Sequence, residues 1–443
     1  MEYTPGSKKD LEKMIESAGV KSVEELFDAI PVQARAKKLR ISGGKTEQEL
    51  LNDFKNLSEK NKTLASFRGA GIYDHHIPSL VGEITSRSEF WTAYTPYQAE
   101  ASQGTLQAIF EYQSFICALT GLDVSNASLY DGATAAAEAA LLALRVSGKK
   151  KILISKALHP EYLKTVKTYL KNSGAKIVLL ELSDGGAVAS SSVDAAIDDD
   201  TAAVLIQSPN YLGVVENMSA LSASAKNKNS LFISVVNPIS LAVFQSPAEY
   251  GADIAVGEGQ PLGMAQSLGG ATFGFMAVRK GLEWKMPGRI VGQTVDKNGK
   301  RGFVLTLQSR EQHIRREKAT SNICTNASLN ALAACVYMAG WGNENFKKLA
   351  ETNISKARYA FNKIKNLDGF EAKFKDSVFF NEFVVDTTKD IKKINKLLLK
   401  NGLLGPLGLS GFDKRFSDSL LFCVTEQRTK AEIDRLAEIL AKA

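Results

Sequence analysis

Between Thr105 and Val278 the sequence alternates between short β-type runs and segments with helical spacing. Short strands separated by helices of about ten residues indicate βαβ units and a mostly parallel sheet. The continuous apolar character of Ile177–Leu180 and Ala203–Ile206 is typical of strands buried on both faces. The sequence therefore predicts an α/β fold. The expected strands are 151–155, 176–182, 202–207, 231–236, 253–256 and 272–278, and the expected helices are 104–119, 133–146, 160–172, 193–197 and 218–226.

The segments on either side of this region have a different character. In the first sixty residues, Ser22–Glu25 and Thr46–Glu49 match the S/T-x-x-E capping box, which predicts helices. After Ala319 two long helices are expected, followed by a β-α-β-α run. We predict an N-terminal helical segment (1–65), a large α/β domain (66–320) and a small C-terminal α+β domain (321–443).

Composition excludes several classes of function. The 443 residues carry a formal charge of +7, but the basic residues are scattered and do not alternate with aromatic ones, so a nucleic-acid partner is not expected. The four cysteines and four histidines lack metal-ligand spacing, so no metal site is expected. Met1–Asp10 lacks the pattern of a secretion signal, and Leu329–Trp341 is too short to span a bilayer. We expect a cytoplasmic protein with no membrane partner.

One candidate site is the segment Tyr94–Gly104, which contains Tyr-Thr-Pro-Tyr-Gln. Its proline restricts the backbone and predicts a shaped loop before a helix. Tyrosine hydroxyls and glutamine amides orient ligands in binding pockets, so Tyr94, Thr95, Tyr97 and Gln98 are candidates for such a role. The same residues also fit an ordinary surface segment leading into a helix.

A second candidate is Asn126–Thr134, which precedes the small-residue helix expected at 135–144. Unpaired N–H groups at a helix N-terminus favour anions. The segment lacks a complete phosphate-binding motif, and capping by Asp131 or Thr134 explains it equally well.

A third candidate is the charged segment Arg310–Cys324, which leads into an apolar helix that Thr320 or Ser321 could cap. One interpretation is a solvated interdomain segment rich in ion pairs. The other is an interface or anion-holding segment, because arginine pairs bidentately with carboxylate and phosphate. His313, Arg315 and Lys318 are its candidate contacts.

Long strings of this chain together resemble the N-terminal half of the glycine cleavage system P-protein. The matching strings are Tyr94–Gly104, Asn126–Arg145, Gly257–Gly270, Met286–Arg289 and Arg310–Thr325. Because the sequence stops after one half, it is similar to subunit 1 of the form that is split into two subunits. The resemblance implies fold type I of pyridoxal 5'-phosphate (PLP) enzymes. It also implies decarboxylation of glycine and transfer of the aminomethyl group to the lipoyl arm of H-protein.

A gap in the lysines separates this chain from the PLP-holding half of the family. From Asn229 to Ala277 there is no lysine, although Lys and Arg supply 55 residues. The resemblance puts Asn237 where an aspartate pairs with the pyridinium nitrogen, and Gln260 where a lysine forms the Schiff base. A neutral amide supplies neither the negative charge nor the amine. We therefore expect a degenerate site, with PLP held on a lysine of the partner subunit.

The resemblance also implies a partner, because fold type I enzymes have active sites at subunit interfaces. We expect an α₂β₂ assembly with P-protein subunit 2, and an interaction with lipoylated H-protein. The candidate active-site or interface residues of this chain are Tyr94, Thr95, Tyr97, Gln98, His313, Arg315 and Lys318. The alternatives are a self-sufficient PLP decarboxylase or aminotransferase that uses another lysine, such as Lys280, and a non-catalytic scaffold.

Overall fold

The computed structural model describes residues 6–36 and 41–443. The chain forms two compact units, Met1–Thr63 and Leu64–Ala443. The predicted boundaries at 65 and 320 stay predictions.

The first unit contains the helices α1 (Lys8–Ser17) and α2 (Glu47–Ser58). The predicted capping box at Thr46 forms, with Thr46 and Glu49 each accepting from the other's backbone N–H. The one predicted at Ser22 forms only in part: Ser22 Oγ accepts from the N–H of Glu25 at 3.4 Å, but Glu25 accepts from the N–H of Lys21, and only a 3-10 turn follows. A capping box that the sequence interpretation missed, between Ser7 and Asp10, begins α1.

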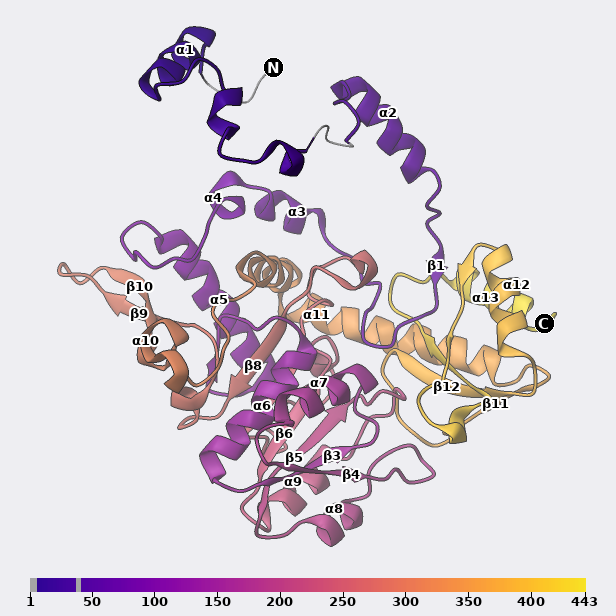
Figure 1. Cartoon of the computed structure of the whole chain (residues 1–443). Coiled ribbons are helices and arrows are strands. Elements are labelled where there is room, and N and C mark those ends of the chain that lie inside the picture. The colour runs from indigo at the N-terminus through magenta and orange to yellow at the C-terminus, as the bar shows by residue number, and fades with distance from the viewer. Residues whose placement is uncertain (1–5, 37–40) are drawn as a thin grey trace. The chain divides into compact units, whose positions relative to one another are not determined.

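A seven-stranded sheet forms the centre of the second unit, with the strand order β2-β8-β7-β6-β5-β3-β4 (Figure 1). Strands β3 to β7 pair in parallel, whereas β8 is antiparallel to β7 and β2 is antiparallel to β8. The predicted mostly parallel α/β sheet is therefore confirmed. The strands are β2 (Val124–Ser125), β3 (Lys151–Ser155), β4 (Lys176–Leu180), β5 (Thr201–Ser208), β6 (Leu231–Val236), β7 (Ile254–Glu258) and β8 (Gly274–Val278).

Helices cover both faces of this sheet. On one face α6 (Gly132–Ser147) and α7 (Pro160–Leu170) lie side by side, packed on side chains such as Ile154 and Leu205 (Figure 1). On the other face lie the strand residues that alternate with these, such as Val204 of β5 and Phe232 of β6. They pack among residues of α8 (Ser190–Ala196) and α9 (Met218–Lys226). Residues of β7 and β8 pack among α5 (Gln103–Thr120) and α11 (Ser328–Ile364). The two-sided burial explains why the strands are apolar throughout.

The C-terminal part contains a smaller sheet with the order β11-β12-β15-β14, all pairs antiparallel. The helix α11 combines the two helices expected at 322–339 and 345–367, with a break at Gly342, where φ is 63°. It begins at Ser328 rather than at residue 322, and neither Thr320 nor Ser321 caps it. The strands are β11 (Phe370–Ala372), β12 (Glu382–Thr387), β14 (Leu407–Gly408) and β15 (Ser419–Cys423), and the helices are α12 (Ile391–Lys400) and α13 (Lys430–Leu440).

The remaining elements are short. An antiparallel hairpin, β9–β10, was not expected from the sequence. These elements are β1 (Ala65–Ser66), which pairs with β13 (Leu403–Leu404), β9 (Ile290–Val295), β10 (Arg301–Thr306), α3 (Ser79–Thr85), α4 (Ser88–Trp91) and α10 (Gln312–Arg315).

Candidate functional site

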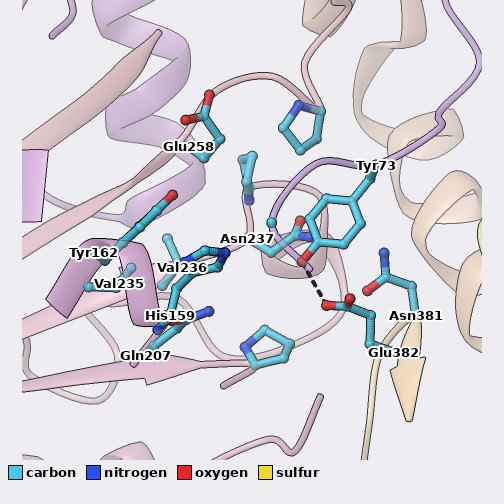
Figure 2. A pocket seen from close by; sticks show the side chains of 14 residues that line it. Tyr73, His159, Tyr162, Gln207, Val235, Val236, Asn237, Glu258, Asn381 and Glu382 are labelled. Atoms are coloured by element: carbon cyan, nitrogen blue, oxygen red, sulfur yellow. Dashed lines mark hydrogen bonds between the residues drawn. The ribbon is translucent and has the colours of Figure 1, made fainter. Parts of the chain in front are cut away.

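A small cavity lies beyond the carboxyl ends of β5, β6 and β7, next to the N-terminus of α6 (Figure 2). Ligands of open α/β sheets bind at this edge. The volume of the cavity is about 40 Å³. One water needs roughly 10–15 Å³ on this measure, so the cavity holds only a few waters. Its walls include Tyr73, His159, Tyr162, Gln207, Asn237, Glu258, Asn381 and Glu382.

Asn237 follows the last residue of β6 directly and points into the cavity (Figure 2). Its Oδ1 accepts from the backbone N–H of Ile239 at 3.0 Å, which fixes the turn after the strand. The side chain is therefore a neutral amide used for local turn formation. It offers no negative charge to a pyridinium nitrogen.

Gln260 comes two residues after β7 and is 1% exposed. Its Oε1 accepts from the N–H of Tyr73 at 2.9 Å, and its Nε2 donates to the carbonyls of Tyr73 at 2.9 Å and Met264 at 2.7 Å. Two of these hydrogen bonds hold the amide to the backbone of Tyr73 in the cavity wall, and the third holds it to Met264. Gln260 therefore acts as a structural link, and it has no amine for an imine.

Glu258, the last residue of β7, places its carboxylate at the N-terminus of α6. Oε2 accepts from the N–H of Gly132 at 3.1 Å, and Oε1 accepts from the N–H of Gln260 at 3.0 Å and from the hydroxyl of Thr272. Burial raises the pKa of Glu258 to about 7. The first N–H of α6, which could otherwise receive an anion, is thus bonded to a carboxylate of the same chain.

Capping completes the N-terminus of α6. Asp131 accepts from the N–H of Thr134 at 2.7 Å, and Thr134 accepts from the N–H of Asp131 at 3.2 Å. Of the two interpretations of Asn126–Thr134, the structure therefore supports capping.

The opposite wall holds a second buried carboxylate, Glu382. It accepts from the hydroxyl of Tyr73 at 2.7 Å, drawn as the dashed line in Figure 2, and from the N–H of Ala70. Burial raises its pKa to about 7. His159 donates Nε2–H to the carbonyl of Ala70 at 2.9 Å, and its Nδ1 accepts from the backbone N–H of Glu161 at 3.2 Å. Burial lowers the pKa of His159. These polar side chains of both walls are thus already hydrogen-bonded to other groups of the chain.

These residues do not fit PLP. Its aldehyde needs an amine, its pyridinium nitrogen needs a carboxylate, and its phosphate needs free N–H donors. Among the described residues, the cavity wall carries the amides of Gln207, Asn237 and Asn381 but no lysine, and the first N–H of α6 is already bonded to Glu258. Ligand pockets measure roughly 300–1,000 Å³, about ten times this volume or more.

A second feature, which we call the Arg289 cluster, consists of Thr95, Tyr97, Arg289, Glu311, His313 and Thr325. Arg289 is 3% exposed and donates to Thr325 Oγ1 at 2.9 Å and to the hydroxyl of Tyr97 at 3.1 Å. A longer contact of 3.4 Å reaches Thr95 Oγ1. The guanidinium also lies 5.3 Å from the centre of the Tyr97 ring, within the range of a cation–π interaction.

Glu311 supplies the negative charge of the cluster. Its carboxylate, 6% exposed, lies 3.6 Å from Nε of Arg289 and 3.8 Å from Nδ1 of His313. The His313 ring meets the Tyr97 ring edge-on at 5.9 Å between centres. Because a buried charge needs a partner, Arg289 and Glu311 pair with each other, while Tyr97 contacts the arginine and His313 contacts the glutamate.

Arg310 fixes the backbone that carries Arg289. It is buried and donates to the carbonyls of Met286 and Gly288, just before Arg289. The carbonyl of Arg289 accepts from the N–H of Ala127 at 2.8 Å. Segments far apart in the sequence are thus joined at this point.

The structure brings only part of the predicted residue set together. Thr95 and Tyr97 contact Arg289, whereas His313 contacts Tyr97 and Glu311. Tyr94, which precedes Thr95, is 86% exposed. Gln98 is exposed.

Arg315 and Lys318 lie outside the cluster. Arg315 donates to the carbonyl of Ser309, and within residues 6–36 and 41–443 no hydrogen bond or ion pair joins Lys318 to the cluster. Arg310 and Glu311 are buried, so the Arg310–Cys324 segment is not simply a solvated connection. The functional roles of the predicted residues stay predictions.

Sequence interpretation missed Arg289, Glu311 and Glu258 as individual residues. The signal was present for the first two, since Met286–Arg289 and Arg310–Thr325 were among the strings that carried the family resemblance. Nothing in the local sequence distinguishes Glu258 from an ordinary strand-end glutamate.

Two features are absent from the described part of the chain. Among residues 6–36 and 41–443 no group of His, Cys, Asp or Glu is arranged to hold a metal ion. In the same residues no helix has both the length and the apolar character needed to cross a membrane.

Comparisons with known proteins agree with one another. A family model described as the glycine cleavage system P-protein matches residues 1–440. The chain is 72% identical to a probable glycine dehydrogenase (decarboxylating) subunit 1 of Endomicrobium trichonymphae, over the full length of both. It is 48% identical to the protein of the same description from Bacillus cytotoxicus, covering 98% of this chain and 97% of that one.

Solved structures give the same result. A crystal structure of glycine decarboxylase (P-protein) of the glycine cleavage system, in inhibitor-bound form, is 38% identical, covers both chains fully and has a TM-score of 0.91. A NifS-like protein, 14% identical with a TM-score of 0.64, covers 86% of this chain and 99% of its own, and shares the fold alone. The predicted fold, PLP fold type I, is confirmed.

Proposed function

The chain belongs to the glycine cleavage system P-protein family, and on this basis we propose that it is the subunit of a decarboxylating glycine dehydrogenase that does not hold PLP. It pairs with a PLP-holding subunit 2, in an α₂β₂ assembly, and completes that subunit's active site. The observation that carries the proposal is the small size of the cavity beyond β5–β7. Only about 40 Å³ is free there, which is too little for the cofactor. A lysine-free 229–277 segment supports the same conclusion.

We assign the Arg289 cluster to the part of this chain that contributes to the active site of the partner subunit. Tyr97 is 53% exposed although its hydroxyl is held by a buried guanidinium. Tyr94 and Trp91, both largely exposed, belong to the same stretch of sequence. Rigid aromatic side chains and arginine are enriched in protein interfaces, and a hydroxyl fixed in advance orients a ligand at low entropic cost. In this role Tyr94, Thr95, Tyr97 and Gln98 position glycine or the lipoyl arm and exclude water.

The chemistry comes from the partner. PLP held on a lysine of subunit 2 supplies the electron sink that decarboxylation of glycine needs. Glycine is the substrate, and lipoylated H-protein receives the aminomethyl group. This chain contributes side chains that bind and orient, with His313 as a contact at the edge of the Arg289 cluster. The predicted cytoplasmic location stays a prediction.

Reconstitution tests the proposal. This chain, subunit 2 and their mixture are each assayed for glycine–bicarbonate exchange in the presence of PLP and lipoylated H-protein. We expect activity in the mixture only. After borohydride reduction, peptide mapping should place the reduced PLP on subunit 2. Exchange by the isolated chain, or reduced PLP on Lys280 or another lysine of this chain, would show that the chain is a self-sufficient PLP enzyme.

Single variants of the assembled complex then separate an active-site role from a scaffold. Tyr97→Phe removes the hydroxyl bonded to Arg289, and Gln98→Ala removes an exposed amide. Loss of one oriented hydrogen bond costs about 0.5–1.5 kcal/mol, so turnover should fall roughly threefold to tenfold. Tyr359→Phe, on α11, removes a tyrosine hydroxyl that donates to Asp434 and serves as the control. Unchanged turnover in both test variants, with the complex intact, would favour a scaffold.

A further inference from the structure

The Arg289 cluster contains three hydroxyl groups that accept from one guanidinium. Nη1 of Arg289 donates to Thr325 Oγ1 at 2.9 Å and to Thr95 Oγ1 at 3.4 Å, and Nη2 donates to the hydroxyl of Tyr97 at 3.1 Å. A guanidinium has no acceptor, so each hydroxyl uses a lone pair toward it and directs its own proton elsewhere. Among residues 6–36 and 41–443, none of the three hydroxyls donates to another group.

The three hydroxyls lie between the buried guanidinium and the surface of the chain. Arg289 is 3% exposed, whereas Tyr97 is 53% exposed, Thr325 is exposed and Thr95 is half-buried. Because all three oxygens surround two nitrogens of one guanidinium, they lie close to one another. Hydrogen bonds polarise one another in series, so the guanidinium makes each outward O–H a stronger donor. Arg289 thus acts on a ligand through the hydroxyls.

The charges around the hydroxyls favour an anion with a single charge. Arg289 and Arg310 are both buried, and the buried carboxylate of Glu311 lies 3.6 Å from Nε of Arg289. Two buried arginines and one buried glutamate leave one positive charge, which a carboxylate balances. A phosphate group carries close to two negative charges and is balanced only in part.

We infer that the hydroxyls of Thr95, Tyr97 and Thr325 bind the carboxylate of glycine in the active site of the partner subunit. The inference rests on the proposed function, and it adds Thr325 as a contact and Arg289 as a positioning residue. Neutral donors suit a decarboxylation. When the bond between the α-carbon and the carboxylate breaks, its electron pair stays on the carbon side and the carboxylate leaves as neutral CO₂. Neutral hydroxyls stabilise the ionised ground state less than a direct arginine contact would, so they oppose this step less.

The test compares glycine with methylamine, which is glycine without its carboxylate. The dissociation constant of each is measured for the complex of this chain with PLP-loaded subunit 2, from the change in the absorbance of the PLP. Thr325→Val keeps the shape of the side chain but removes its hydroxyl. Loss of one hydrogen bond to a charged group should weaken glycine binding on the order of tenfold, whereas methylamine binding should change less than threefold.

Two matched variants serve as controls. Thr325→Ser keeps the hydroxyl and should bind glycine within about threefold of the natural complex. Thr352→Val, on α11, removes a hydroxyl that donates to the carbonyl of Lys348 and should leave both dissociation constants unchanged. Circular dichroism and analytical ultracentrifugation check that each variant folds and assembles. Thr95→Val takes the place of Thr325→Val should that variant not fold or assemble.

Three results would overturn the inference while leaving the proposed function intact. The first is glycine binding that the loss of the hydroxyl changes less than threefold, and the second is an equal weakening of glycine and methylamine. The third is a raised dissociation constant for PLP itself, which would show that the hydroxyls hold its phosphate. If the natural complex does not bind glycine at all, the proposed function fails and the inference fails with it.

Discussion

Replacing Glu258 by glutamine should change how the stability of this protein depends on pH. Burial raises the pKa of Glu258 from its ordinary value of 4.5 to about 7. The fold therefore prefers the neutral carboxyl group. The stability that this preference provides is complete below about pH 4.5 and is lost as the pH rises to about 7 and above.

The size of the effect follows from the shift in pKa. A rise of this size corresponds to about 3 kcal/mol between the two protonation states. Since the carboxylate keeps three donors and some solvent contact, we expect about 2–3 kcal/mol. Glutamine does not ionise, so the variant does not lose this stability at high pH. At pH 5 it should be slightly less stable than the natural protein, because its amide nitrogen cannot accept from Gly132.

The measurement is urea unfolding followed by circular dichroism between pH 5 and 8. The difference in the free energy of unfolding should move by about 2–3 kcal/mol in favour of Glu258→Gln over this range. Burial also raises the pKa of Glu216 and Glu382 to about 7, but they are the same in both proteins and cancel in the difference. The exposed Glu317→Gln variant is the control and should show no such trend. A difference that stays constant from pH 5 to 8 would refute the reasoning.

Three further changes test the packing of the two sites. Arg289→Ala leaves the buried carboxylate of Glu311 unpaired and should lower the free energy of unfolding by about 3–5 kcal/mol in urea titrations, so a loss below about 1 kcal/mol would contradict the pairing. Gln260→Lys supplies an amine without enlarging the cavity, so mass spectrometry after borohydride reduction should find no PLP on residue 260; such an adduct would show that the cavity opens. Gly213→Ala should lower the melting temperature by several degrees, because φ is 81° and the new Cβ would lie 2.2 Å from the carbonyl oxygen of Glu382. An unchanged melting temperature would mean that this backbone shifts freely.

Much of the fold could be predicted from the sequence because its strands and helices are encoded locally. The alternation of β runs and helices from 105 to 278 gave the parallel strands, since their two-sided burial leaves an apolar run that is visible in the sequence. Predictions from local patterns were wrong where a long-range contact used the same residue. Ser321 was a possible helix cap, but its hydroxyl donates to Glu138 across 183 residues. The β9–β10 hairpin was missed although Asn298-Gly299, a strong hairpin signal, stands between the two strands, and Gly299 has a φ of 79°.

The predicted site residues were found in part, for a similar reason. The Tyr-Thr-Pro-Tyr-Gln string stood out by its own composition, but the arginine that holds Thr95 and Tyr97 comes 192 residues after Tyr97. No spacing rule joins positions that far apart, and only the folded backbone brings them together. Arg315 and Lys318 belong to the same charged string as His313, but neighbouring side chains of one segment point in different directions, and Arg315 bonds to the carbonyl of Ser309 instead.

The sequence by itself determined that residues 229–277 contain no amine to hold an aldehyde, and that amides stand at Asn237 and Gln260. The presence or absence of a functional group is a property of each residue and needs no coordinates. Only the tertiary structure decided that Glu258 is bonded at the N-terminus of α6 and that the remaining cavity measures about 40 Å³. The volume of a cavity and the hydrogen-bond partners of a carboxylate arise from packing between distant segments, so they are fixed only once the chain has folded.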